Sequence, residues 1–307
     1  MIKKLVPIAL FSAILFSMNS CKSGGGFKTT ESGLQYQIVK DEKTGQTPAV
    51  GDLVEIHMIA KYKDKETDTT LFNSRQMNNG NAMSFPLPAP SYKGDIVEAF
   101  MLLTPGDSAV IRMSVDSFKK QAGGMMPPYM KDGEFIEYNV VMVSVKSQKD
   151  MQQEKEKHDA EQIVTDEKLL QDYFTANSIN PAKTVSGVYY TVEKDGKGEN
   201  VKNNQQVTVK YTGKTLDGKA FDSNTDPQFN HVEPFIFTVG RGEVIPGWDE
   251  GLTYFKKGSK GKLFIPSTLA YGAEGRGEFI PKDAILVFDI EVVNIEDAPA
   301  PQNMPVQ

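Results

Sequence analysis

The chain repeats itself, and this limits how its 307 residues can fold. Residues 32–36 (SGLQY) return as residues 186–190 (SGVYY), 154 positions later. Further pairs follow in the same order at similar offsets, such as 136–145 with 286–295. A shared order and a near-constant offset indicate a duplicated domain. The chain is therefore expected to fold as two copies of one unit.

Both copies are rich in β-prone sequence. Val207, Val209 and Tyr211 alternate with polar residues, which is the pattern of a strand with one buried face. Residues 137–145 and 286–295 are continuous β-prone runs. Each copy is therefore expected to be built mainly from strands.

The second copy has room for one short helix, predicted over Gly247–Lys257. Trp248, Leu252 and Phe255 stand at positions i, i+4 and i+7 and so share one helical face. The lysines that end this segment favour the negative end of a helix, and Gly258 can take the left-handed conformation that stops one. A sheet with one helix on one face is an α+β arrangement.

A segment of different composition separates the two copies. Residues 149–162 are almost all charged or polar, and the next stretch carries Ile163, Leu170 and Phe174 on one stripe. This pattern predicts a helix that is solvated at first and docked later. A passive spacer and a dimerisation helix are both open, and the stripe is short for a coiled coil, which favours the spacer. The expected organisation is a signal peptide at 1–20, a flexible tether at 21–30, a first domain at 31–148, a helical linker at 149–180, a second domain at 181–297 and a disordered tail at 298–307.

The first twenty residues have the pattern of an export signal. Lys3 and Lys4 precede an apolar run, residues 5–18, that is too short to span a membrane. The run stops just before Cys21, the only cysteine in the chain. This arrangement resembles a bacterial lipoprotein signal, in which that thiol is lipidated; the alternative is an ordinary secretory signal with an incidental cysteine. The resemblance predicts a protein of the cell envelope, facing the periplasm and held to a membrane through the Cys21 lipid only.

Composition argues against several classes of function. The formal net charge is −6, and phosphate binding needs a basic face, so no nucleic-acid partner is expected. The three histidines and the single cysteine are scattered, which predicts no metal site and no cofactor. No segment after the signal is apolar enough to cross a bilayer.

Aromatic side chains are dense in the second copy. Aromatic residues often serve only the core, and that is the expectation for Phe237. Trp248, the only tryptophan of the chain, would lie at the start of the predicted helix next to Gly247, where the floor of a pocket can be reached. The set is Tyr211, Phe221, Phe235, Phe237, Trp248, Tyr271, Phe279 and Phe288.

These residues stand in ordered motifs, and residues 185–296 resemble the FKBP family of peptidyl-prolyl cis/trans isomerases. The segments that carry the resemblance are 209–213 (VKYTG), 217–223 (DGKAFDS), 235–240 (FIFTVG), 243–252 (EVIPGWDEGL), 265–272 (IPSTLAYG) and 280–289 (IPKDAILVFD). The resemblance implies two FKBP-like domains, each a twisted antiparallel sheet wrapped on one short helix. It also implies an enzyme that speeds rotation about X–Pro bonds without a cofactor.

The resemblance gives roles to ten residues. Trp248 would form the floor of an apolar pocket, Phe221 would contact the proline ring and Ile280 would lie at the rim. Asp222 and Tyr271 would be the polar groups beside the substrate carbonyls, although Asp222 could instead serve a turn and Tyr271 could be a strand aromatic with an exposed hydroxyl. The walls would be Tyr211, Phe235, Val244, Ile245 and Phe288, and the N–H of Ile245 would receive a carbonyl.

Two positions depart from the family pattern. The segment 223–234 lacks the arginine that often pairs with the site aspartate, so Asp222 needs another partner or leaves the polar role to Tyr271. Arg276 stands where a histidine is common. Both changes lie at the rim, where they are expected to alter substrate preference rather than abolish activity.

The first copy keeps the strand pattern and loses the polar pair. Its counterparts are predicted to be Met58 for Tyr211, Phe72 for Phe221, Asn73 for Asp222, Ile96 for Trp248 and Tyr138 for Phe288. Residues 121–128, with two methionines, replace the tyrosine loop by a soft apolar lip. This copy is interpreted as a degenerate domain that binds or packs but catalyses poorly; a purely structural spacer is the alternative.

Three functions compete. The first is a periplasmic isomerase for exported, proline-containing polypeptides, with macrolide inhibitors as further ligands of its pocket. The second is a chaperone-like module that binds unfolded envelope proteins, with incidental isomerase activity. The third, a lipoprotein with a purely structural role, leaves the retained pocket residues unexplained.

Overall fold

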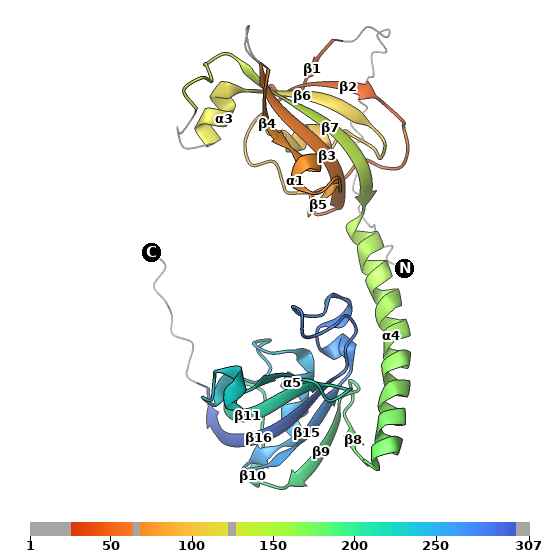
Figure 1. Cartoon of the computed structure of the whole chain (residues 1–307), viewed down its shortest axis with the longest axis vertical. Coiled ribbons are helices and arrows are strands. Elements are labelled where there is room, and N and C mark those ends of the chain that lie inside the picture. Colours follow the sequence, from red (N-terminus) through yellow and green to blue (C-terminus); the bar gives the residue numbers. More distant parts are fainter. Residues whose placement is uncertain (1–25, 64–67, 122–126, 299–307) are drawn as a thin grey trace, which may run out of the picture. The chain divides into compact units, whose positions relative to one another are not determined.

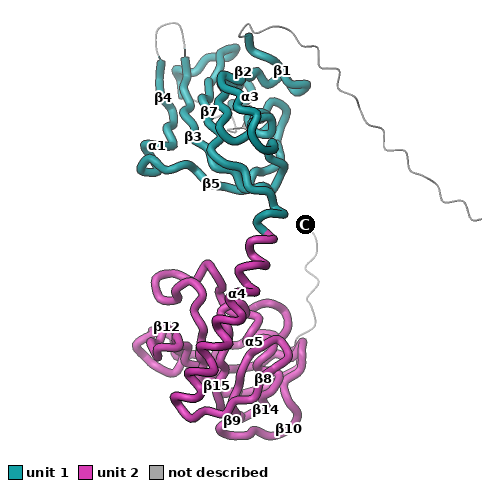
Figure 2. Tube along the Cα trace, turned by 90° about the vertical axis from the view of Figure 1, so that its right-hand side faces the viewer, with its two compact units in different colours: residues 1–151 teal, residues 152–307 magenta. Residues whose placement is uncertain are grey.

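The computed structural model describes residues 26–63, 68–121 and 127–298 (Figure 1). They form two compact units that meet between Met151 and Gln152 (Figure 2). The expected signal peptide, Cys21, the methionines of the predicted lip and all but one residue of the predicted tail lie outside the described residues. No helix within these ranges is both long and apolar enough to cross a membrane.

Unit 1 is a curved antiparallel sheet with short helices between its strands. Its sheet is seven-stranded within the described residues. Helices α1 and α3 were not predicted, and α2 contributes Val97, Ala99 and Phe100 to the core. The elements are β1 Lys28–Thr29, β2 Gln35–Lys40, β3 Leu53–Lys63, β4 Asp68–Asn73, α1 Ser74–Met77, β5 Met83–Pro86, α2 Val97–Phe100, β6 Ser108–Ser114, α3 Val115–Gln121 and β7 Phe135–Lys146.

Unit 2 has the same construction and also includes most of the long helix α4, Gln148–Asn177. Its main sheet is also seven-stranded over the part of the chain described. The elements are β8 Ala182–Lys183, β9 Tyr189–Lys194, β10 Lys197–Asn200, β11 Gln205–Thr215, β12 Ala220–Ser223, η1 Pro227–Phe229, β13 Phe235–Thr238, α5 Pro246–Gly251, η2 Leu252–Tyr254, β14 Lys256–Lys257, β15 Lys260–Ile265, η3 Ser267–Leu269, η4 Gly272–Glu274 and β16 Leu286–Asp297, where η marks a 3₁₀ helix.

The two sheets have the same strand order, as the internal repeat predicts. The order is β1-β2-β6-β7-β3-β4 in unit 1 and β8-β9-β15-β16-β11-β12 in unit 2. The short strands β5 and β13 also take the same place, since β5 pairs with β3 and β13 pairs with β11. All of these pairings are antiparallel. The α+β fold class is therefore confirmed.

The helix expected over Gly247–Lys257 is shorter than predicted. Helix α5 begins at Pro246 and ends at Gly251, and a 3₁₀ turn then carries the chain to Tyr254. The two lysines expected at the helix end form strand β14, which pairs with β10. Pairing with a neighbouring strand thus overrides helix propensity in this segment. Trp248, Leu252 and Phe255 are nevertheless all buried in the core of unit 2.

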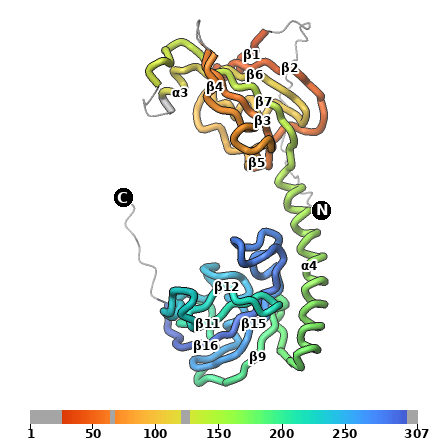
Figure 3. The backbone as a smooth tube through the Cα atoms, viewed as in Figure 1, coloured from red at the N-terminus to blue at the C-terminus, as the bar shows by residue number. Residues whose placement is uncertain are grey.

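Helix α4 docks on unit 2 through its C-terminal half. Figure 3 shows α4 beside strands β9 and β15. Leu170 and Phe174 are buried there among Tyr189 and Phe264, strand residues of the sheet. Ile163, predicted on the same stripe, is 54% exposed, so that part of the prediction was wrong. The helix is not a spacer over this half, because its residues complete a hydrophobic cluster of unit 2.

Candidate active site

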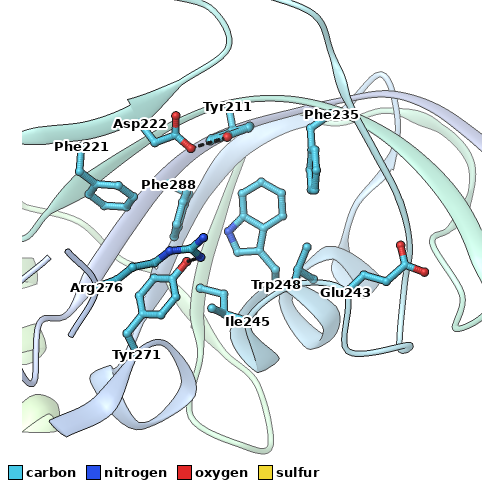
Figure 4. A pocket seen from close by; sticks show the side chains of 11 residues that line it. Tyr211, Phe221, Asp222, Phe235, Glu243, Ile245, Trp248, Tyr271, Arg276 and Phe288 are labelled. Carbon is cyan, nitrogen blue, oxygen red and sulfur yellow. Dashed lines mark hydrogen bonds between the residues drawn. The ribbon is translucent and has the colours of Figure 1, made fainter. Parts of the chain in front are cut away.

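A cavity of about 470 Å³ opens into unit 2 between the sheet, α5 and the loop after β15 (Figure 4). Strands β11, β12, β13 and β16 supply one side of it, and the start of α5 supplies its floor. Its lining is mainly aromatic and aliphatic, with charged groups at a few places. The lining residues are Tyr211, Phe221, Asp222, Phe235, Glu243, Val244, Ile245, Trp248, Tyr271, Arg276 and Phe288.

Trp248 stands in the centre of this cavity (Figure 4). Its indole is 4% exposed and meets two rings edge-on, with centroid distances of 5.1 Å to Tyr211 and 5.1 Å to Phe288. Edge-to-face contacts of this kind stabilise aromatic pairs beyond simple burial. Phe237 packs behind, at 5.8 Å from the indole, and is core as predicted. The neighbouring rings therefore fix the orientation of the Trp248 indole, which forms the floor of the cavity.

Gly213 makes room for two of the lining rings. A Cβ at this position would lie 2.6 Å from Cζ of Phe221 and 2.8 Å from Cε1 of Phe288. Contacts this short are forbidden, so any larger residue would push one ring away. The ring of Phe221 lies edge-on to Phe288, 5.7 Å between centroids. Glycine in the middle of β11 is thus required by the shape of the cavity.

One polar group of the cavity is built from three residues. The hydroxyl of Tyr211 donates a hydrogen bond to Oδ2 of Asp222 at 2.6 Å, and Nε2 of His231 lies 2.7 Å from Oδ1 of the same carboxylate. Burial raises the pKa of the Tyr211 phenol, and the bond to Asp222 raises it further. The phenol therefore keeps its proton and acts as a donor, which leaves Asp222 oriented from both sides.

A second polar group lies across the cavity. The Arg276 guanidinium donates to the hydroxyl of Tyr271 at 2.8 Å and lies over its ring, 5.2 Å from the centroid. Ile280 holds Arg276 in place, because the two residues exchange backbone hydrogen bonds of 2.8 and 3.2 Å. Ile280 itself is buried at 6% exposure and does not line the cavity. The structure therefore does not place Ile280 at the rim of the cavity, where it was predicted to lie.

Comparison with known proteins places the chain in a family. The family model described as FKBP-type peptidyl-prolyl cis-trans isomerase matches residues 197–293. The peptidyl-prolyl cis-trans isomerase Fkbp12 of Drosophila melanogaster is 45% identical over 95 residues, which are 31% of this chain and 84% of that protein. This chain belongs to the FKBP-type peptidyl-prolyl isomerase family.

Two bacterial relatives are similar over the same region. The FK506-binding protein of Neisseria meningitidis serogroup C is 43% identical over 98 residues, which are 32% of this chain and 86% of that protein. The FKBP-type isomerase FkpA of Aeromonas hydrophila is 44% identical over 135 residues, 43% of this chain. The match spans 48% of the length of that FkpA, about half of it.

Nine of the ten residues assigned by resemblance to the FKBP family line the cavity, and Ile280 is the exception.

Sequence reasoning missed two residues of the site. His231 takes the place expected of the absent arginine as a partner of Asp222, and its position inside the segment 223–234 was the only available signal. Glu243 lines the cavity and accepts a hydrogen bond from the N–H of Thr238. Within the described ranges, no cluster of side chains suits a metal ion.

Strand pairing gives the counterparts of two site residues in unit 1. Ala60 of β3 pairs with Tyr138 just as Gly213 of β11 pairs with Phe288, which confirms Tyr138 as the counterpart of Phe288. Tyr138 is 8% exposed, and burial raises its pKa.

The pairing of β3 with β4, compared with that of β11 with β12, corrects another prediction. Ala60 also pairs with Phe72, while Gly213 pairs with Asp222. Phe72 therefore occupies the place of Asp222, and the prediction that it matches Phe221 was wrong by one residue. Both units have a bulge here that leaves Leu71 and Phe221 without a register partner, so strand pairing aligns Leu71 with Phe221, whereas the similar local sequences align Phe72 with it. An aromatic ring in unit 1 thus replaces the carboxylate of unit 2.

Proposed function

We propose that this protein accelerates cis/trans isomerisation of X–Pro peptide bonds in the cavity of unit 2. One observation carries the proposal: Trp248 forms the floor of an open cavity with aromatic walls and two hydrogen-bonded polar groups on its sides. The Drosophila and Aeromonas relatives that match this region are named as peptidyl-prolyl isomerases, and the match covers 84% of the Drosophila protein.

The cavity suits the physical demands of the reaction. Rotation about an X–Pro bond faces a barrier of about 18–20 kcal/mol, because twisting destroys the resonance of the amide. No bond is made or broken, so neither a nucleophile nor a metal is needed. The twisted amide is less dipolar than the planar one, and a dry apolar cavity therefore favours it. Lowering the barrier by roughly 7 kcal/mol would accelerate rotation about 10⁵-fold.

The polar groups would hold the peptide while the amide turns. The prolyl ring would rest on Trp248 beside Phe221, the hydroxyl of Tyr271 would donate to one carbonyl, and the N–H of Ile245 would donate to another. Asp222 would orient the flanking peptide from the opposite wall. These roles follow the FKBP family, and the described positions of the side chains in the cavity support them.

An isomerase assay on the full chain tests the proposal. The unsubstituted protein should accelerate isomerisation of a proline tetrapeptide, and Asp222→Ala should slow it. Asp217→Ala is the matched control, because Asp217 lies in the exposed turn before β12 and bonds only to that turn. FK506, for which a relative is named, should inhibit the reaction and change the fluorescence of the single tryptophan. Failure of the full chain to exceed the uncatalysed rate would reject the proposal.

A chaperone-like binding function is the second candidate, and the outer face of the unit 1 sheet favours it. A hollow of about 280 Å³ there is lined largely by apolar and neutral side chains, among them Ile59, Val110 and Val141, with Arg75 as the charged one. In unit 2, Lys262 and Glu291 occupy the sheet positions that correspond to Val110 and Val141. Both of these charged residues form ion pairs. Among the described residues this apolar patch lies in unit 1 and not at the corresponding place in unit 2, which favours it as a binding surface for unfolded chains.

Aggregation of a proline-free client measures this second function separately. Val141→Glu would give unit 1 the residue type of its counterpart and should weaken protection without changing isomerase activity. Asp222→Ala should do the reverse. Equal protection by the unsubstituted protein and Val141→Glu would exclude the sheet face as the binding surface.

We further propose that the protein is a lipoprotein of the cell envelope. The proposal rests on the sequence of residues 1–21, with its basic start, short apolar run and single cysteine. Mass spectrometry of the mature N-terminus should find acyl chains on Cys21, and Cys21→Ser should release the protein from the membrane fraction. An unmodified Cys21 in membrane-free protein would refute the anchor.

A further inference from the structure

We infer that helix α4 supports the isomerase site from outside the cavity, and that Asp166 is a positioning residue for the segment carrying Tyr271. The inference rests on the proposed function of the cavity in unit 2. It assigns a role to a helix that lies outside the matched family region, which begins at residue 197.

Asp166 is a fully buried carboxylate on α4. It is 0% exposed, and its Oδ2 accepts a hydrogen bond of 2.6 Å from the N–H of Ser267. Its Oδ1 accepts another, of 2.7 Å, from the side-chain amide of Gln162. Ser267 is the first residue of η3 and is also 0% exposed. The first N–H groups of a helix have no acceptor within it, so Asp166 caps η3 from 101 residues away.

This cap lies next to the segment that carries Tyr271. Helix η3 ends at Leu269, and Tyr271 follows two residues later with its hydroxyl in the cavity. The turn is closed by a hydrogen bond of 2.9 Å from the N–H of Ala270 to the carbonyl of Ser267. A shift of Ser267 would therefore be transmitted through one tight turn to Tyr271. An ångström-scale displacement of a positioned group is enough to slow catalysis.

Helix α4 also holds the other side of Tyr271. His158 bonds through Nε2 to Oδ1 of Asp283 at 2.9 Å. The N–H of Asp283 in turn donates to the carbonyl of Gly272, the residue directly after Tyr271, at 2.8 Å. One helix thus anchors the loop before and after the tyrosine. The pair of His158 and Asp283 is partly exposed, so Asp166 is the stronger of the two anchors.

Apolar packing also holds α4 on unit 2. Asp166, Leu170 and Phe174 recur every four residues and are the buried residues of the helix. The ring of Phe174 meets Phe264 and Tyr189 with centroid distances of 5.0 Å each. Phe264 belongs to β15, which ends at Ile265, just before η3. The apolar cluster and the cap therefore join the same strand and turn to the helix.

The test uses the full chain with substitutions at Asp166. Asp166→Ala leaves the N–H of Ser267 without its acceptor, and we expect kcat/KM to fall roughly tenfold. Asp166→Asn keeps an oxygen that can accept this bond and should retain most of the activity. Asp172→Ala is the control on the same helix, since Asp172 is exposed and pairs only with Lys168. It should leave the rate unchanged.

Two further measurements separate positioning from loss of stability. Leu170→Ala destabilises the same helix contact without touching η3, so it should lower the melting temperature but keep kcat/KM well below that temperature. Asp166→Ala combined with Tyr271→Phe should be no slower than Tyr271→Phe alone, because Asp166 acts through the tyrosine. Hydrogen exchange should quicken at residues 267–272 in Asp166→Ala and not in Asp172→Ala.

The results distinguish this inference from the proposed function. An unsubstituted chain without isomerase activity would remove the proposed function and the catalytic part of the inference together. An active chain in which Asp166→Ala matches the unsubstituted rate and exchange would overturn the inference alone. So would equal losses of kcat/KM in Asp166→Ala and Leu170→Ala.

Discussion

His231 is the feature that most distinguishes this site from the family pattern, and its removal gives a quantitative prediction. His231→Ala leaves Asp222 with the hydroxyl of Tyr211 as its remaining bonded partner in the cavity. A hydrogen bond to a charged group can contribute more than 1 kcal/mol, but His231 and Asp222 are 45% and 39% exposed, so solvent screens the pair. After this discount the bond contributes about 0.5–1 kcal/mol, which corresponds to roughly a two- to fivefold fall in kcat/KM.

The assay is the isomerisation of a proline tetrapeptide by the full chain. His231→Arg supplies another donor, of the kind common in the family, and should restore the rate. Gln228→Ala changes an exposed side chain in the same segment and should have no effect. His231→Ala should add nothing to Asp222→Ala, because both act on one carboxylate. If Asp222→Ala is slow while His231→Ala keeps the full rate, His231 does not orient the carboxylate.

Three other changes should have measurable effects. Gly213→Ala should slow isomerisation strongly while the protein stays folded by circular dichroism, because the new Cβ displaces Phe221 or Phe288; a normal rate would show that the rings adapt. Leu170→Ala should lower the free energy of unfolding of unit 2 by about 2–5 kcal/mol in urea titrations, since the side chain is 0% exposed. Burial alone would raise the pKa of Asp289, but hydrogen bonds and charge from two lysines lower it below its ordinary value of 3.8. Its contribution to stability is therefore present above pH 3.8 and lost as pH falls through the lowered pKa, so the melting temperatures of the protein and of Asp289→Asn should converge in acid.

The sequence by itself determined the repeat, the fold class and most of the cavity. Alternation of apolar residues at 207, 209 and 211 reports a strand with one buried face, because side chains of a strand point to opposite sides in turn. The motif around Trp248 stands in one continuous segment, and its position at the start of a helix follows from the local order of residues. The ten site residues were expected from the resemblance to the FKBP family, and nine of them line one cavity.

Only the tertiary structure decided which distant groups meet. His231, in the segment between β12 and β13, bonds to Asp222. Asp166 bonds to Ser267, 101 residues away in sequence, because α4 docks on the sheet. The alignment of Phe72 with Asp222 is likewise set by strand pairing. Hydrogen bonds between segments depend on distances of a few tenths of an ångström, and no periodicity along the chain encodes them. The sequence therefore predicts the walls of the site, while the fold selects the partners that hold its polar groups.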